Sequence, residues 1–135
     1  MKATLSLAAV AVVAVFGAAC ASTDVVPGQY DTAIVYPNIT LQSPELQRSL
    51  GFQEPVVSET ESGLMRVTVP VRSRRNQEIH LQYKVIWLDA DGNPIRPEMN
   101  WRYRRMEPLQ PAYLSASATS ETAENYNMQI RWGRQ

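Results

Sequence analysis

The stretch EIHLQYKVIWLDADGNPI, residues 78–95, alternates apolar and polar side chains and then enters a turn. The apolar side chains recur at every second position, at Ile79, Leu81, Tyr83, Val85 and Trp87. Successive side chains of a β-strand point to opposite faces, so this period predicts a strand with one buried face. The pair Asp91-Gly92 accepts the backbone angles of a tight turn, which predicts a hairpin directly after the strand.

The same two-residue period recurs on both sides of this strand. Strong candidates lie at residues 65–72, 99–104, 113–119 and 126–132, and weaker ones at residues 32–41 and 56–60. Short strands at regular spacing, separated by turn residues, are typical of an all-β sandwich. We therefore expect an antiparallel β-sandwich of about seven strands, in one domain over residues 33–135.

Two local signals refine this expectation. Pro70 cannot donate a hydrogen bond to a ladder, so the strand over residues 65–72 is expected at a sheet edge, or with a bulge at that point. Residues 43–52 predict one or two helical turns, with Ser43 as the N-cap and Gly51 after the last turn.

The first residues have the layout of a secretory signal peptide. Lys2 is followed by an apolar run over residues 5–16 and then by small residues. The run is shorter than the roughly 20 apolar residues that a membrane-spanning helix needs. Residues 1–19 are therefore predicted to be removed from the mature protein.

Cys20, the only cysteine in the chain, lies at the end of this segment. Ala18-Ala19-Cys20 resembles the lipobox of bacterial lipoproteins, with Gly17 standing where the pattern usually has Leu, Val or Ile. The resemblance implies that Cys20 is lipidated on sulfur and becomes the new N-terminus. The alternative is ordinary cleavage at the A-x-A site Ala19-Cys20-Ala21, which would leave no cysteine.

Residues 20–32 are expected to form the lipidated N-terminus and a flexible tether. Pro27-Gly28 lies within it, and a flexible coil of about 12 residues reaches about 20 Å. Ala21 rather than Asp follows the cysteine, which by resemblance implies the periplasmic face of the bacterial outer membrane. The sequence thus predicts a lipid-anchored domain that works close to the membrane surface.

Composition excludes several classes of function. The chain has 13 basic and 13 acidic side chains, and one of the basic ones, Lys2, lies in the predicted signal peptide. A near-neutral charge argues against nucleic-acid binding, which depends on neutralising phosphates. The chain has one cysteine and one histidine, His80. These are too few for a disulfide or a typical zinc site, and they argue against a nucleophile paired with a base. We therefore expect no enzyme activity, metal or cofactor.

The segment YKVIWLDADGNPI, residues 83–95, resembles the YcfL family of small proteobacterial lipoproteins. That family shares a Y-[KR]-x-x-W-x-D-x-x-G pattern, matched here by Tyr83, Lys84, Trp87, Asp89 and Gly92. The similarity covers approximately residues 34–133, and it implies an immunoglobulin-like sandwich. The family has no established activity, so the resemblance implies no catalytic residues.

A basic and aromatic cluster after the hairpin is the candidate binding site. It contains Arg96, Trp101, Arg102 and Arg104. In a strand, Arg102 and Arg104 share one face and Trp101 lies on the other. Guanidinium groups bind phosphate and carboxylate bidentately, so this face could hold lipid headgroups or peptidoglycan carboxylates. The alternative is a structural strand with a solvated basic face and a buried aromatic face.

Two functions follow from these features. The first is a non-enzymatic interaction module, held by its lipid anchor at the outer membrane, that offers an edge strand or its loops to an envelope protein partner. The second is direct binding of an anionic envelope glycan (peptidoglycan) or lipid through the arginines of the cluster.

Overall fold

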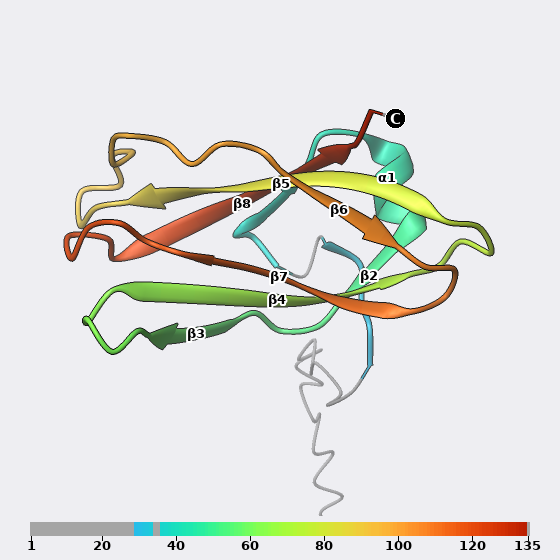
Figure 1. Cartoon of the computed structure of the whole chain (residues 1–135), viewed down its shortest axis with the longest axis horizontal. Coiled ribbons are helices and arrows are strands. Elements are labelled where there is room, and N and C mark those ends of the chain that lie inside the picture. Colours follow the sequence, from blue (N-terminus) through green and yellow to red (C-terminus); the bar gives the residue numbers. More distant parts are fainter. Residues whose placement is uncertain (1–28, 34–35, 135) are drawn as a thin grey trace, which may run out of the picture.

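Two β-sheets stack on one another in the computed structural model, with a short helix at one end (Figure 1). The structure describes residues 29–33 and 36–134. The elements in chain order are β1 (Ile39–Leu41), α1 (Pro44–Ser49), β2 (Leu50–Phe52), β3 (Val56–Glu59), β4 (Met65–Ser73), β5 (Ile79–Leu88), β6 (Arg102–Met106), β7 (Pro111–Ser117) and β8 (Asn125–Trp132). This arrangement confirms the predicted all-β sandwich.

One sheet, called the β5 sheet below, has the strand order β1-β8-β5-β6. Its pairs are antiparallel except for β1 and β8, which are parallel. The other, called the β4 sheet, is built around β4, which pairs with β7 on one side and with β2 and then β3 on the other. In Figure 1 the strands β3, β4 and β7 form one layer and β5, β6 and β8 the other.

The core lies between the facing surfaces of the two sheets. Most positions expected inside from the two-residue period are buried, whereas Met65 and Trp132 are only partly buried. The buried ones are Val67, Val69, Val71, Ile79, Leu81, Tyr83, Val85, Trp87, Leu114, Ala116, Met128 and Ile130. Removing apolar surface from water contributes about 25 cal/mol per Å². The alternating side chains are therefore the main source of stability in this fold.

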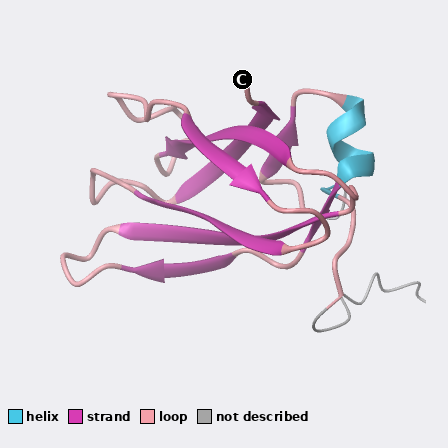
Figure 2. Ribbon diagram, turned by 45° about the vertical axis from the view of Figure 1, so that its right-hand side comes forward, coloured by secondary structure: helices cyan, strands magenta, loops and turns pink. Residues whose placement is uncertain are grey.

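The helix α1 begins at its predicted N-cap. Ser43 Oγ accepts a hydrogen bond from the backbone N–H of Glu45 at 3.3 Å, and Pro44 occupies the first helical position. Leu46 of the helix is fully buried. Figure 2 shows α1 at one end of the sandwich, and the buried leucine explains how the helix closes that end of the core.

Gly51 follows the last helical turn, as predicted, because α1 ends at Ser49 with Leu50 as its C-cap. The backbone is already extended at Leu50, and Gly51 lies within β2 opposite Arg72 of β4. A Cβ atom on Gly51 would lie 2.8 Å from the Cβ of Tyr30. The glycine is therefore needed for a close approach of two chain segments and not for a helix end.

The expectation that β4 lies at a sheet edge is wrong, because β4 is the central strand of its sheet. The carbonyl of Pro70 accepts a hydrogen bond from the N–H of Gln53 at 3.0 Å. Pro70 thus faces the interval in which β2 has ended at Phe52 and β3 has not yet begun at Val56. Because the neighbouring strand is interrupted there, a residue without an N–H is tolerated.

Two other features differ from the expected antiparallel sandwich of about seven strands. The structure has eight strands in its described part, since the three-residue β2 is too short to show a period. β1 is parallel to β8, with Ile39 opposite Met128. No hairpin joins these two strands, so their direction is not constrained by a turn. The immunoglobulin-like connectivity implied by the family resemblance stays a prediction.

The chain joins the β4 sheet before β1 begins. Asp31 and Phe52 exchange two backbone hydrogen bonds, both of 2.7 Å. The last part of the predicted tether, residues 29–32, thus lies beside β2. The predicted signal peptide, Cys20 and the rest of the tether lie outside the described residues. Within the described ranges, no helix has the length and apolar character needed to cross a membrane.

Candidate functional site

The strand β6 carries two arginines of the candidate site. Arg102 lies opposite Tyr83 and Arg104 opposite Leu81, and both of these β5 residues face the core. Paired residues of neighbouring strands share a face, so the two arginines are on the inner face of the β5 sheet. They remain exposed because β6 is the edge strand. We call Arg102 and Arg104 the arginine face.

Arg102 contacts the opposite sheet. Its Nη1 donates to the carbonyl of Ser115 on β7 at 3.2 Å, and the hydroxyl of Tyr83 donates to the same oxygen at 3.1 Å. Two donors from the β5 sheet therefore meet one acceptor of the β4 sheet. Arg104 makes no side-chain hydrogen bond or ion pair with any described residue.

Arg96 and Trp101 lie away from the arginine face. The Arg96 side chain is 74% exposed and pairs with Glu98 at 3.1 Å. The ring of Trp101 lies 3.9 Å from the guanidinium carbon of Arg131 and 5.1 Å from Nζ of Lys84, on the outer face of the β5 sheet. The four candidate residues thus do not form one surface.

The alternative of a buried aromatic face is wrong at Tyr103. This side chain is 52% exposed, because no second layer covers the outer face of the β5 sheet at this point. Tyr103 forms a hydrogen bond with His80 and stacks on its ring, with 5.6 Å between the ring centroids. His80 also contacts Glu78 at 3.1 Å. The only histidine therefore belongs to a surface network of polar and aromatic groups.

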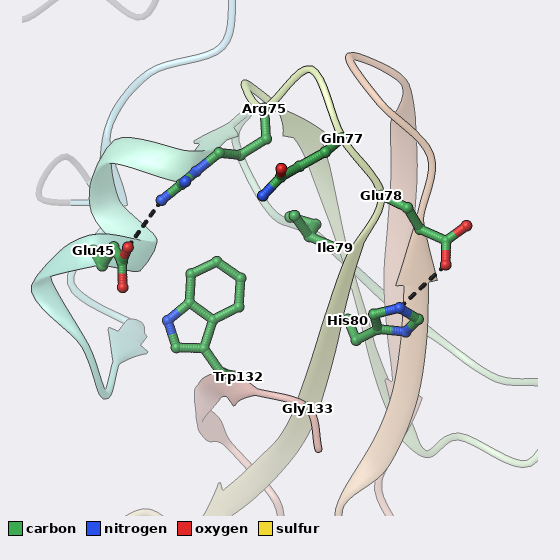
Figure 3. A pocket seen from close by; sticks show the side chains of 8 residues that line it. All are labelled: Glu45, Arg75, Gln77, Glu78, Ile79, His80, Trp132 and Gly133. Carbon is green, nitrogen blue, oxygen red and sulfur yellow. Dashed lines mark hydrogen bonds and ion pairs between the residues drawn. The ribbon is translucent and has the colours of Figure 1, made fainter. Parts of the chain in front are cut away.

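A hollow of about 400 Å³, called the Glu45 hollow below, opens beside Trp132. Figure 3 shows the Trp132 indole between Glu45 of α1 and His80 of β5. The charged groups are already paired here: Glu45 with Arg75 at 3.2 Å, and Glu78 with His80. The indole N–H of Trp132 is buried and has no acceptor in the described part of the chain.

A second hollow, of about 500 Å³, is also lined by Trp132. Its lining side chains are Gln42, Ser43, Gln82, Arg131, Trp132 and Arg134. We call it the Arg131 hollow. Its volume falls within the range of about 300–1,000 Å³ that is usual for small-molecule sites.

The strand β3 is a free edge of the β4 sheet. All four of its residues are exposed, with Val56 at 57% and Val57 at 52%. The N–H of Thr60 donates to the carbonyl of Leu64, and backbone groups alternate in direction along an antiparallel strand. Val57 and Glu59 therefore point their N–H and C=O groups away from β4, where no described strand pairs with them.

A third hollow, of about 310 Å³, adjoins this edge. Its lining residues are Val57, Ser58, Glu59, Gly63, Met65, Glu121 and Ala123. Val57, Met65 and Ala123 supply apolar surface, while Glu59 and Glu121 supply two exposed carboxylates. We call it the Glu59 hollow. It combines an apolar wall with a negative rim.

The titratable groups with shifted pKa values are core tyrosines. Burial raises the pKa of Tyr36, and the nearby charges of Asp31 and Glu54 raise it further. Burial also raises the pKa of Tyr126, and this effect outweighs a hydrogen bond from Asn38 that lowers the pKa. Both phenols are thus held neutral. Among the described side chains, no group of three His, Cys, Asp or Glu is placed to hold a metal ion.

The three hollows were not predicted from the sequence, although some of their lining residues, such as Ser43 and His80, were named there for other reasons. Glu59 lies in a stretch that gave only a weak strand signal, and Glu121 lies in a turn far from it in sequence.

Arg131 alternates with the core residue Ile130, so the two-residue period predicts that its side chain points outward. The period does not predict which side chains of neighbouring strands lie beside it. Trp132 was expected in register with the core, and it is only partly buried.

The sequence of residues 37–132 matches a family model described as "Protein of unknown function (DUF1425)". The matched segment is more than half of the chain. No match was found among curated proteins.

Two crystal structures share the fold. The Campylobacter jejuni protein cj0090 is 22% identical with a TM-score of 0.60, over 71% of this chain and 98% of that chain. A DUF1425 family member from Shewanella sp. pv-4 is 21% identical with a TM-score of 0.56, over 64% of this chain and 80% of that chain. At these identities the likeness shows the fold alone.

Proposed function

The chain belongs to the DUF1425 family, and from this premise we propose that it is a non-enzymatic interaction module of the cell envelope. In this proposal it is a YcfL-type lipoprotein, anchored through Cys20 to the periplasmic face of the outer membrane. Its domain accepts a β-strand from an envelope protein at β3. The observation that carries the proposal is the exposed free edge of β3.

The main chain of β3 supports strand addition. Val57 and Glu59 present unpaired N–H and C=O groups, which are the groups that an added strand uses. Free edges are usually protected by charged side chains. β6 has such protection from its three arginines, whereas β3 has the sequence VVSE with a single charge. Of these two edges, β3 is the one open to a partner.

The Glu59 hollow indicates the chemistry of the partner strand. A side chain next to β3 would lie against Val57, Met65 and Ala123, with Glu59 and Glu121 at the rim. Lys and Arg combine an apolar stem with a cationic end, so they match both parts of this surface. We expect the added strand to carry a Lys or Arg at this position.

A second copy of this chain is a poorer match for β3. Pairing two β3 edges would bring the carboxylates of the two Glu59 hollows towards each other, and like charges across a ladder are destabilising. The expected occupant is therefore a different protein with a basic strand.

The anchor and tether limit where this partner can lie. A coil of about 12 residues after Cys20 reaches about 20 Å, so the domain would stay close to the membrane. Two or three acyl chains, at about 0.8 kcal/mol per buried CH₂, would hold the protein there without help from an amphipathic helix.

The test places a photo-crosslinking amino acid at Val56 of the full-length protein in cells. The matched control is Tyr113 of β7, which is 62% exposed on the other side of β4. We expect one envelope protein to be crosslinked from Val56 and none from Tyr113. Replacing both Glu59 and Glu121 by Lys should lower the yield several-fold, because the negative rim is lost.

Three results would contradict this proposal. They are equal adducts from both positions, no adduct from Val56, or an adduct consisting of two copies of this chain. The third would assign β3 to self-association.

Direct binding of an anionic envelope glycan or lipid through the arginine face is a second candidate function. The observation that favours it is Arg104, which is exposed and has no ion pair with any described residue. Arg104→Glu should then abolish binding to isolated peptidoglycan or to anionic vesicles and leave the Val56 crosslink unchanged. Unchanged binding to both surfaces would exclude this role for Arg104.

A further inference from the structure

The Arg131 hollow has the charge of an anion-binding site. Two of its lining side chains are arginines, Arg131 and Arg134, and none of them is acidic. In a partly enclosed site, positive charge without a carboxylate partner attracts an anion more strongly than in open water. The volume of about 500 Å³ fits a small ligand.

Arg131 is held in place before any ligand arrives. Its Nε donates to Oε1 of Gln82 at 2.8 Å, and its guanidinium carbon lies 3.9 Å from the centre of the Trp101 ring. These two contacts fix the plane of the guanidinium group, and its terminal nitrogens donate to no described residue. A fixed guanidinium with free N–H groups is suited to a bidentate carboxylate, because little ordering remains to be done on binding.

The neighbouring Glu45 hollow does not have this property, although both hollows share Trp132. Its carboxylates Glu45 and Glu78 are paired with Arg75 and His80. An anion there would compete with bound carboxylates for the same cations. The Arg131 hollow is therefore the preferred place for an anionic ligand.

The other lining groups indicate what carries the anion. Trp132 supplies an apolar wall, while Gln42, Gln82 and Ser43 supply amide and hydroxyl groups that both donate and accept hydrogen bonds. A sugar ring has an apolar C–H face and hydroxyl groups at its rim, which match these two kinds of surface. We propose that the Arg131 hollow binds a saccharide unit that bears a carboxylate. This site is independent of strand addition at β3 and of the arginine face.

The test uses the full chain, purified in a detergent without a sugar headgroup, and two matched probes. N-acetylmuramic acid carries a carboxylate that N-acetylglucosamine lacks. The chain has three tryptophans, so binding can be followed by their indole N–H signals in NMR spectra. We expect N-acetylmuramic acid to shift the signals of Trp101 and Trp132 and to leave that of Trp87, which is 5% exposed in the core. N-acetylglucosamine should bind at least about tenfold more weakly.

Two arginine variants and one control locate the site. Arg131→Gln should weaken binding of N-acetylmuramic acid at least about tenfold. Arg134→Gln should weaken it in the same direction, and the exposed Arg134 side chain makes no hydrogen bond or ion pair with described residues on which folding would depend. Arg66→Gln removes an exposed arginine on β4, in the other sheet, and should bind as the parent does.

Several results would overturn the inference. They are equal affinity for the two sugars, unchanged affinity in both Arg131→Gln and Arg134→Gln, or a weakening by Arg66→Gln as large as theirs. Inorganic phosphate that binds as tightly as N-acetylmuramic acid would also overturn it, since the saccharide would then contribute nothing.

Discussion

Arg102 and Arg104 lie two positions apart on β6, share one face and have different surroundings. The guanidinium of Arg102 reaches the carbonyl of Ser115 on the opposite sheet, together with the hydroxyl of Tyr83. Arg104 has no such acceptor among the described residues. A period of two in the sequence places both on one face, but it cannot show which of them meets the other layer.

This difference predicts unequal effects on stability. Arg102→Ala should lower the free energy of unfolding by about 1 kcal/mol, because the bridge to Ser115 is lost. Arg104→Ala should change it by less than about 0.5 kcal/mol. Urea denaturation of the two variants measures this, and equal losses would show that the bridge between the sheets contributes nothing.

Tyr36 gives a second prediction at this scale. Its hydroxyl is buried and has no partner in the described chain, so Tyr36→Phe should leave stability unchanged or raise it by up to about 1 kcal/mol.

The same residue links stability to pH. Burial raises the folded-state pKa of Tyr36 above 10.0, so between this value and the raised pKa the unfolded chain releases a proton that the folded chain keeps. Stability should therefore fall as pH rises above 10, and should fall less in Tyr36→Phe. Urea midpoints at about pH 9 and about pH 11 measure both effects. An equally steep loss in parent and variant would contradict the assignment to Tyr36.

At the scale of elements, long strands are predictable and short ones are not. β4, β5, β7 and β8 show a clear period because each has seven or more residues. β2 has three residues and depends on its pairing with β4, which no local pattern reveals. Pro70 indicated an edge strand because the sequence shows that its backbone N–H is missing. The sequence does not show that the neighbouring strand is interrupted between β2 and β3. The free edge at β3 and the Glu59 hollow could not be predicted from the sequence either, because both depend on how separate segments pack together.

The attachment of the N-terminal segment to β2 depends on Gly51. In Gly51→Ala the new Cβ would lie 2.8 Å from the Cβ of Tyr30, so the segment must move. We expect a loss of about 1–3 kcal/mol, typical of overpacking. The amide of Asp31, which donates to Phe52, should exchange with solvent faster. Gln53→Ala, the neighbouring control, should keep this protection, and a protected Asp31 in Gly51→Ala would contradict the account.

In the molecule as a whole, the sequence predicts an N-terminal anchor, and the described sandwich has an exposed edge at β3. The described domain begins beside β2, and its β3 edge belongs to the same sheet. We propose that the anchor, the tether and the β3 edge together let the domain meet its partner near a membrane.

The anchor has its own test. Cys20→Ala should move the protein from the membrane fraction to the soluble periplasmic fraction, because no acyl chain can be attached. Cell fractionation and immunoblotting measure the distribution, with Ser22→Ala as the control that keeps the cysteine. A Cys20→Ala protein that sediments with membranes as well as the parent would refute lipid anchoring.

Strand addition at β3 is tested by crosslinking from Val56 in cells that carry Val57→Pro or Val57→Thr. Proline removes the outward N–H of residue 57, which an added strand needs, and is tolerated on an edge strand whose N–H faces solvent. Threonine keeps that N–H at similar size. If a strand is added at β3, the crosslink is lost in Val57→Pro and retained in Val57→Thr, with both variants folded. Equal yields in the two variants would show that no strand is added at β3.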